Sequence, residues 1–137
     1  MRPDVNRAVA ALLCITLTAL CFGYAWLRSD LPVWWRLNGG GVVYVVFWIT
    51  FGFVFFPYRR RVVAICVTAT ALTCLLEILQ LWKPAWLLKF RATKFGAALL
   101  GSEFAWQDIP PYLIGGIAGY GLLLAACSLS RSKTPDV

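Results

Sequence analysis

The feature that most constrains this chain is a series of four apolar runs, three of them about as long as a bilayer is thick. The runs cover residues 8–27, 42–56, 62–82 and 109–129. A helix rises about 1.5 Å per residue, so about 20 residues cross the roughly 30 Å hydrocarbon core. Hydrophobic residues make up 61% of the 137 positions, above the roughly 45–50% of soluble domains. The sequence therefore predicts an all-α membrane protein with four transmembrane helices, forming a single membrane domain over residues 1–137.

The longest connection lies between the third and fourth runs. Its residues 85–100 mix aromatic side chains with Lys89, Arg91 and Lys94. Three cations in sixteen residues make a poor spanning segment. We expect an interfacial or re-entrant helical segment here.

Three consecutive glycines, Gly39 to Gly41, come just before the second run. Glycine is a poor helix former, so we expect these residues to end any helix and the second span to begin at Val42. Trp34 and Trp35, a few positions earlier, fit the aromatic belt at headgroup depth.

The net charge of +7 is concentrated between the apolar runs. Lysine and arginine at such positions set membrane orientation and contact anionic headgroups, so we expect the lipid bilayer as partner and no nucleic acid. Arg59, Arg60 and Arg61 stand in the shortest connection, where the positive-inside rule is strongest. This places the amino and carboxyl ends in the cytoplasm and residues 83–107 on the extracytoplasmic side.

The cysteines give no sign of a metal or disulfide site. All five lie inside apolar runs, none forms a C-x-x-C pair, and the chain has no histidine. Structural zinc needs cysteine or histidine ligands at close spacings. We therefore expect small apolar filler at these positions, no metal, and no cofactor.

A polar stripe runs along the third span. Thr70, Thr73, Glu77 and Gln80 follow at spacings of three and four residues, which places them on one helix face. A carboxylate within a span costs about 2.5–3.5 kcal/mol on insertion scales, so this face should meet other helices or a wet cavity.

Several polar residues should converge at the membrane face where the third span ends: Glu77, Gln80, Arg91, Lys94 and Asp108, which starts the fourth span. One interpretation is structural, with Glu77 paired to Arg91 and Asp108 capping a helix that carries prolines in its first turn. A second is a headgroup pocket, with Arg91 and Lys94 as anion contacts. A third makes Glu77 or Asp108 a general base.

The fourth span contains Gly115-x-x-x-Gly119. This spacing of small residues lets membrane helices approach closely. It predicts helix packing through these two glycines, within the chain, in a homo-oligomer or against another membrane protein.

The order of these residues resembles the VanZ-like membrane proteins. Those carry a glutamate-x-x-glutamine at the end of one span, an arginine in the following loop, and an aspartate heading a glycine-bearing span. The matching positions are Glu77, Gln80, Arg91, Asp108 and Gly115. The gap between the arginine and the aspartate is longer here than in the VanZ-like pattern. The stretch from Leu76 to Trp82 is similar to a small bacterial family with four predicted spans, known as a domain of unknown function.

The resemblance implies a cell-envelope setting and supplies no settled activity. Together with the residues, it leads us to expect a multi-pass protein of the bacterial inner membrane that binds an anionic lipid or lipid-linked headgroup at the extracytoplasmic face. The alternatives are a membrane enzyme acting on a lipid-linked envelope substrate and a small structural or assembly partner. Binding without catalysis is favoured over an enzyme.

Overall fold

The computed structural model describes residues 4–96 and 105–131, and its described part consists of helices and short connections. Four helices are long and apolar enough to cross a membrane, which confirms the predicted fold class. The main helices are α1 (Arg7–Leu27), α2 (Val33–Phe55), α3 (Val62–Leu79), α4 (Ala85–Arg91) and α6 (Ile109–Arg131). One-turn 3₁₀ segments at Arg28–Asp30, Arg59–Arg61 and Trp106–Asp108 precede α2, α3 and α6.

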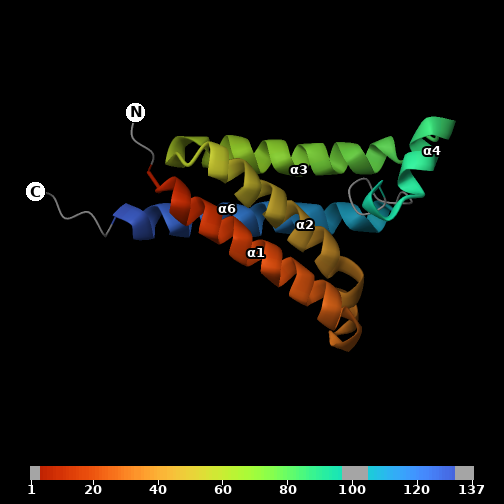
Figure 1. Ribbon diagram of the computed structural model, residues 1–137, viewed down its shortest axis with the longest axis horizontal. Helices are drawn as coiled ribbons and strands as arrows, with labels where there is room; N and C mark the ends of the chain where they lie inside the picture. The colour runs from red at the N-terminus through yellow and green to blue at the C-terminus, as the bar shows by residue number, and fades with distance from the viewer. Residues whose placement is uncertain (1–3, 97–104, 132–137) are drawn as a thin grey trace, which may run out of the picture.

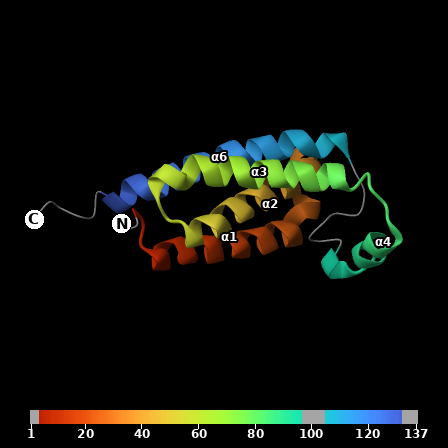
Figure 2. The same cartoon turned by 90° about the horizontal axis from the view of Figure 1, so that it is seen from above.

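Helix α2 is the central element of the bundle. It packs against α1, α3 and α6, and α6 also packs against α3 (Figures 1 and 2). Most buried side chains are apolar, and one cluster of them contains Val45, Ile49 and Phe53 of α2 with Leu123 and Cys127 of α6. In a bilayer such helices gain from close packing rather than from leaving water.

The glycine run does not end a helix, so the predicted boundary at Val42 is wrong. Helix α2 begins at Val33 and continues through all three glycines. A Cβ at Gly39 would come within 2.9 Å of Tyr24 on α1, and one at Gly41 within 3.0 Å of Tyr112 on α6. These glycines let neighbouring helices approach α2, and tertiary packing outweighs their weak helix propensity.

The amino-terminal segment folds back onto the connection between α2 and α3. The backbone N–H groups of Asp4 and Val5 donate to the carbonyl of Pro57, at 3.0 and 3.3 Å. The Asp4 carboxylate accepts a 2.8 Å hydrogen bond from the backbone N–H of Arg59. The start of the chain and the triple arginine therefore lie at the same end of the bundle.

The opposite end carries most of the tryptophans on its surface. This end comprises the end of α1, the start of α2, the end of α3 with α4, and the start of α6, as Figure 1 shows. Its exposed tryptophans are Trp26, Trp34, Trp35, Trp82, Trp86 and Trp106. Such a ring of indoles marks a membrane–water interface.

Helix α4 lies at this end, beyond α3 (Figure 1). It buries Leu87 and Arg91 and exposes Trp86 and Phe90, the two-sided pattern of an interfacial helix. The expected segment 85–100 is thus helical at Ala85–Arg91 and again at residues 94–96, and its residues 97–100 lie outside the described part of the chain.

Candidate functional site

A buried carboxylate forms the centre of the candidate site. Glu77 stands in the last turn of α3 and is only 2% exposed. Its Oε1 accepts a 2.9 Å hydrogen bond from the backbone N–H of Ala105, and its Oε2 accepts from Tyr112 Oη at 2.8 Å and from Gln80 Nε2 at 3.0 Å. Donors from three parts of the chain thus replace the water that the carboxylate loses on burial.

Tyr112 also belongs to the site, although the sequence did not identify it as a site residue. It lies in the first turns of α6, four residues after Asp108. A tyrosine within an apolar helix usually finds a hydrogen-bond partner for its hydroxyl. Its one-turn spacing from Asp108 was the signal that could have identified it.

Gln80 ends α3 and is 4% exposed. Its amide nitrogen donates to Glu77, and because an ionised carboxylate only accepts, this contact fixes the orientation of the amide. The other amide atom, Oε1, is buried and has no hydrogen-bond partner in the part of the chain that the structure describes.

Arg91 reaches back from α4 to the end of α3 and is 6% exposed. Its two terminal guanidinium nitrogens donate to the carbonyl oxygens of Leu79 and Gln80, at 3.3 and 3.4 Å. A cation is favourable at a helix carboxyl end, where the carbonyl dipoles converge. Arg91 therefore anchors α4 to α3.

These contacts do not pair Arg91 with Glu77. Arg91 donates to the carbonyls at the end of α3, and Glu77 accepts from Ala105 and Tyr112. The Nε–H of Arg91 is buried and finds no acceptor among the described residues. Arg91 and Gln80 thus each bring one unpaired polar atom to the end of α3.

The two remaining predicted residues lie at the edge of this cluster. Asp108 ends the 3₁₀ turn before α6 and is partly buried. Lys94 follows α4 and is exposed. The structure thus gathers Glu77, Gln80 and Arg91 inside and leaves Lys94 at the surface. Helix α6 begins directly after Asp108, as predicted.

The two packing glycines of α6 face α2. A Cβ at Gly115 would come within 2.7 Å of the Val42 carbonyl oxygen, and one at Gly119 within 2.6 Å of Ile49. Gly116 makes the same kind of approach to Thr70 of α3. These contacts bring α6 close to its neighbours and hold Tyr112 over Glu77.

The fold and the site together define a multi-pass integral membrane protein with a buried polar cluster at one end of its bundle. A family model described as "Protein of unknown function (DUF2809)" matches residues 30–116. This range is more than half of the chain, and the protein belongs to that family. The match includes Glu77, Gln80, Arg91 and Tyr112. No solved structure matches the chain.

Proposed function

We propose that this protein binds the polar headgroup of an anionic or lipid-linked membrane lipid at the end of the bundle where α3 meets α4 and α6. The observation that carries the proposal is the pair of buried atoms, Gln80 Oε1 and Arg91 Nε, that lack partners in the described part of the chain. An unpaired buried polar group costs about 1–3 kcal/mol. A bound group that pairs with both atoms removes that cost.

The hydrogen-bonding chemistry of the two atoms limits the kind of group that can bind them. Gln80 Oε1 accepts a hydrogen bond and Arg91 Nε–H donates one, so a hydroxyl group, which does both, suits them. The exposed ammonium of Lys94, three positions after Arg91, would attract a nearby phosphate. A headgroup with glycerol or sugar hydroxyls beside a phosphodiester combines these properties.

The resemblance to VanZ-like proteins supports the setting of this proposal. The resemblance rests on Glu77, Gln80 and Arg91, which form the cluster, and on Asp108 at its edge. We place the protein in the bacterial inner membrane with this end on the extracytoplasmic side and both chain ends in the cytoplasm. The residues 1–3 and 132–137 lie outside the described part.

Binding without catalysis fits the contacts better than the two alternatives. Both oxygens of Glu77 already accept hydrogen bonds from the protein itself, which leaves the carboxylate little freedom to take a proton from a substrate. Gly115 and Gly119 pack against α2 within the chain, so an assembly partner would need another surface.

The test compares two anionic lipids that differ in their headgroup hydroxyls. Purified protein is offered equal amounts of phosphatidylglycerol, which has headgroup hydroxyls, and phosphatidic acid, which lacks them, and native mass spectrometry counts the bound lipid. We expect retention of phosphatidylglycerol over phosphatidic acid. Gln80→Met keeps the side-chain length, removes the acceptor and should abolish this preference. Gln107→Met, at an exposed position of the same end, should preserve it.

A second pair of variants tests the charge. Lys94→Gln should weaken retention of both lipids at this site by about fivefold, the effect of one basic residue at an anionic surface. Lys89→Gln, also exposed, is the matched control. A wild type without preference for the hydroxylated lipid, or a Gln80→Met variant that keeps the preference while folded by circular dichroism, would refute the proposal.

A further inference from the structure

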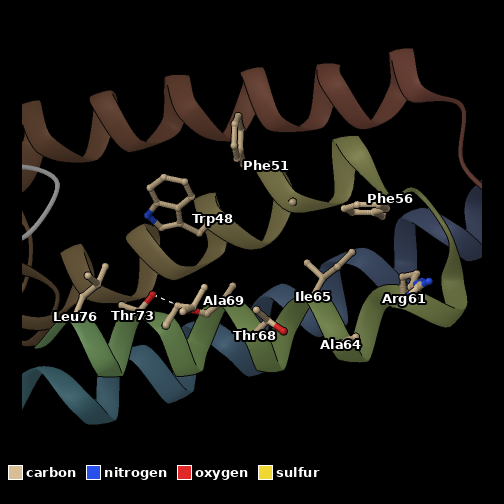
Figure 3. Close-up of a pocket in the computed structure, with 12 residues that line it drawn as sticks. Trp48, Phe51, Phe56, Arg61, Ala64, Ile65, Thr68, Ala69, Thr73 and Leu76 are labelled. Atoms are coloured by element: carbon tan, nitrogen blue, oxygen red, sulfur yellow. Dashed lines mark hydrogen bonds between the residues drawn. The ribbon is translucent and has the colours of Figure 1, made fainter. Parts of the chain in front are cut away.

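A second feature of the molecule uses none of the residues of the Glu77 cluster. An apolar groove of about 670 Å³ runs between α2 and α3. One wall includes Trp48 and Phe51 of α2 and Phe56 directly after it, and the other extends from Arg61, directly before α3, to Leu76 on α3. Figure 3 shows these residues, with Arg61 at one end of the groove and Leu76 toward the other.

Small side chains create the space. Ala64, Thr68 and Ala69 line the α3 side, where larger residues would fill the groove. On the α2 side, Gly52 lets the two helices come together, since a Cβ there would lie 3.3 Å from Ile65. The aromatic side chains of α2 thus line one side of the groove, and the small side chains of α3 line the other.

The groove is long enough to hold an acyl chain. Fifteen residues separate Arg61 from Leu76, which is about 22 Å along a helix. One leaflet supplies about half of the roughly 30 Å hydrocarbon core. A lipid whose headgroup lies at the Arg61 end could therefore extend a whole acyl chain along α3.

Arg61 distinguishes this groove from a purely apolar one, which would accept the chain of any lipid in a bilayer. It is the one charged residue among the described residues that line the groove. A guanidinium binds phosphate oxygens through two parallel hydrogen bonds. Arg60, its neighbour, instead lies over the ring of Tyr58, 5.7 Å from the centroid.

From this geometry we infer that the groove between α2 and α3 is a binding site for an anionic phospholipid, with its phosphate on Arg61 and one acyl chain along α3. The phosphate position at Arg61 lies at the opposite end of the bundle from the Glu77 cluster, on the side of the triple arginine, and the acyl chain extends from there toward Leu76. This site is independent of the proposed headgroup site.

The first experiment separates Arg61 from general surface charge. Wild-type protein and the variants Arg61→Gln and Arg60→Gln are offered equal amounts of phosphatidylglycerol and phosphatidylcholine, and native mass spectrometry counts the bound lipid. Arg61→Gln should reduce the preference for the anionic lipid about fivefold, and Arg60→Gln should keep most of that preference. Equal losses in the two variants would show attraction to the basic loop alone and would overturn the inference.

The second experiment fills the groove without changing the charge. Ala64→Phe places a ring in the groove, whereas Ala71→Phe makes the same change at an exposed position of α3 outside it. The first variant should lose the bound anionic lipid and the second should retain it. An Ala64→Phe variant that retains the lipid would refute the site. Gln80→Met should leave this lipid in place, so failure of the headgroup proposal and failure of this one are distinguishable.

Discussion

The hydroxyl of Tyr112 donates a 2.8 Å hydrogen bond to the buried carboxylate of Glu77 and thereby joins α6 to α3. The two residues are 35 positions apart in the sequence. Gln80 and the backbone of Ala105 supply the other donors. A charge that would be costly inside the bundle is thus held by groups from three parts of the chain, and the three hydrogen bonds fix the end of the bundle.

Replacement of Tyr112 by phenylalanine should destabilise the fold. The change keeps the ring and removes one donor to a buried carboxylate, a loss of about 1–3 kcal/mol in the free energy of unfolding. Chemical unfolding in mild detergent measures the difference. Tyr120→Phe, on an exposed part of the same helix, is the control and should change stability by less than about 0.5 kcal/mol.

Replacement of Arg91 by methionine should release α4 while leaving the four long helices folded. The methionine retains an apolar side chain of similar length but cannot donate to the carbonyls of Leu79 and Gln80. We expect faster hydrogen exchange in residues 83–96 and unchanged exchange in α2. Lys89→Met, which alters an exposed cation of the same helix, should leave both segments as they are. Unchanged protection of α4 in Arg91→Met would contradict the anchoring role.

Two glycines of α6 should respond to alanine with opposite signs. Gly115→Ala forces a methyl group against the Val42 carbonyl, 2.7 Å away, and should cost about 1–3 kcal/mol. Gly121→Ala meets nothing within 4 Å and should gain about 0.5–1 kcal/mol from better helix propensity. Thermal unfolding of the two variants in the same detergent compares them directly. A stable Gly115→Ala variant would show that α2 and α6 are further apart than described.

The parts of the fold that could be predicted from the sequence are those set by local composition. Span length and hydropathy belong to single segments, so four spanning helices could be predicted. The neighbouring positions of Glu77 and Gln80 follow from a spacing of three along a helix, and the Gln80-to-Glu77 hydrogen bond confirms it.

The parts that could not be predicted depend on a choice between competing partners. Arg91 could satisfy a carboxylate or the carbonyls at the end of α3, and the sequence does not contain the turn geometry that selects the carbonyls. The Gly39–Gly41 run could break a helix or admit its neighbours, and only the positions of Tyr24 and Tyr112 decide this. In both cases tertiary contacts override local preference.

The most direct test is a pair of double-mutant cycles centred on Glu77. Unfolding free energies in mild detergent are measured for Glu77→Gln, Tyr112→Phe and Arg91→Met, and for the first combined with each of the others. Residues in direct contact show coupling of about 0.5–3 kcal/mol, and we expect this between Glu77 and Tyr112. Between Glu77 and Arg91 we expect a smaller value. Strong coupling to Arg91 with none to Tyr112 would contradict the account, because the buried acid would then be held by the loop cation rather than by α6.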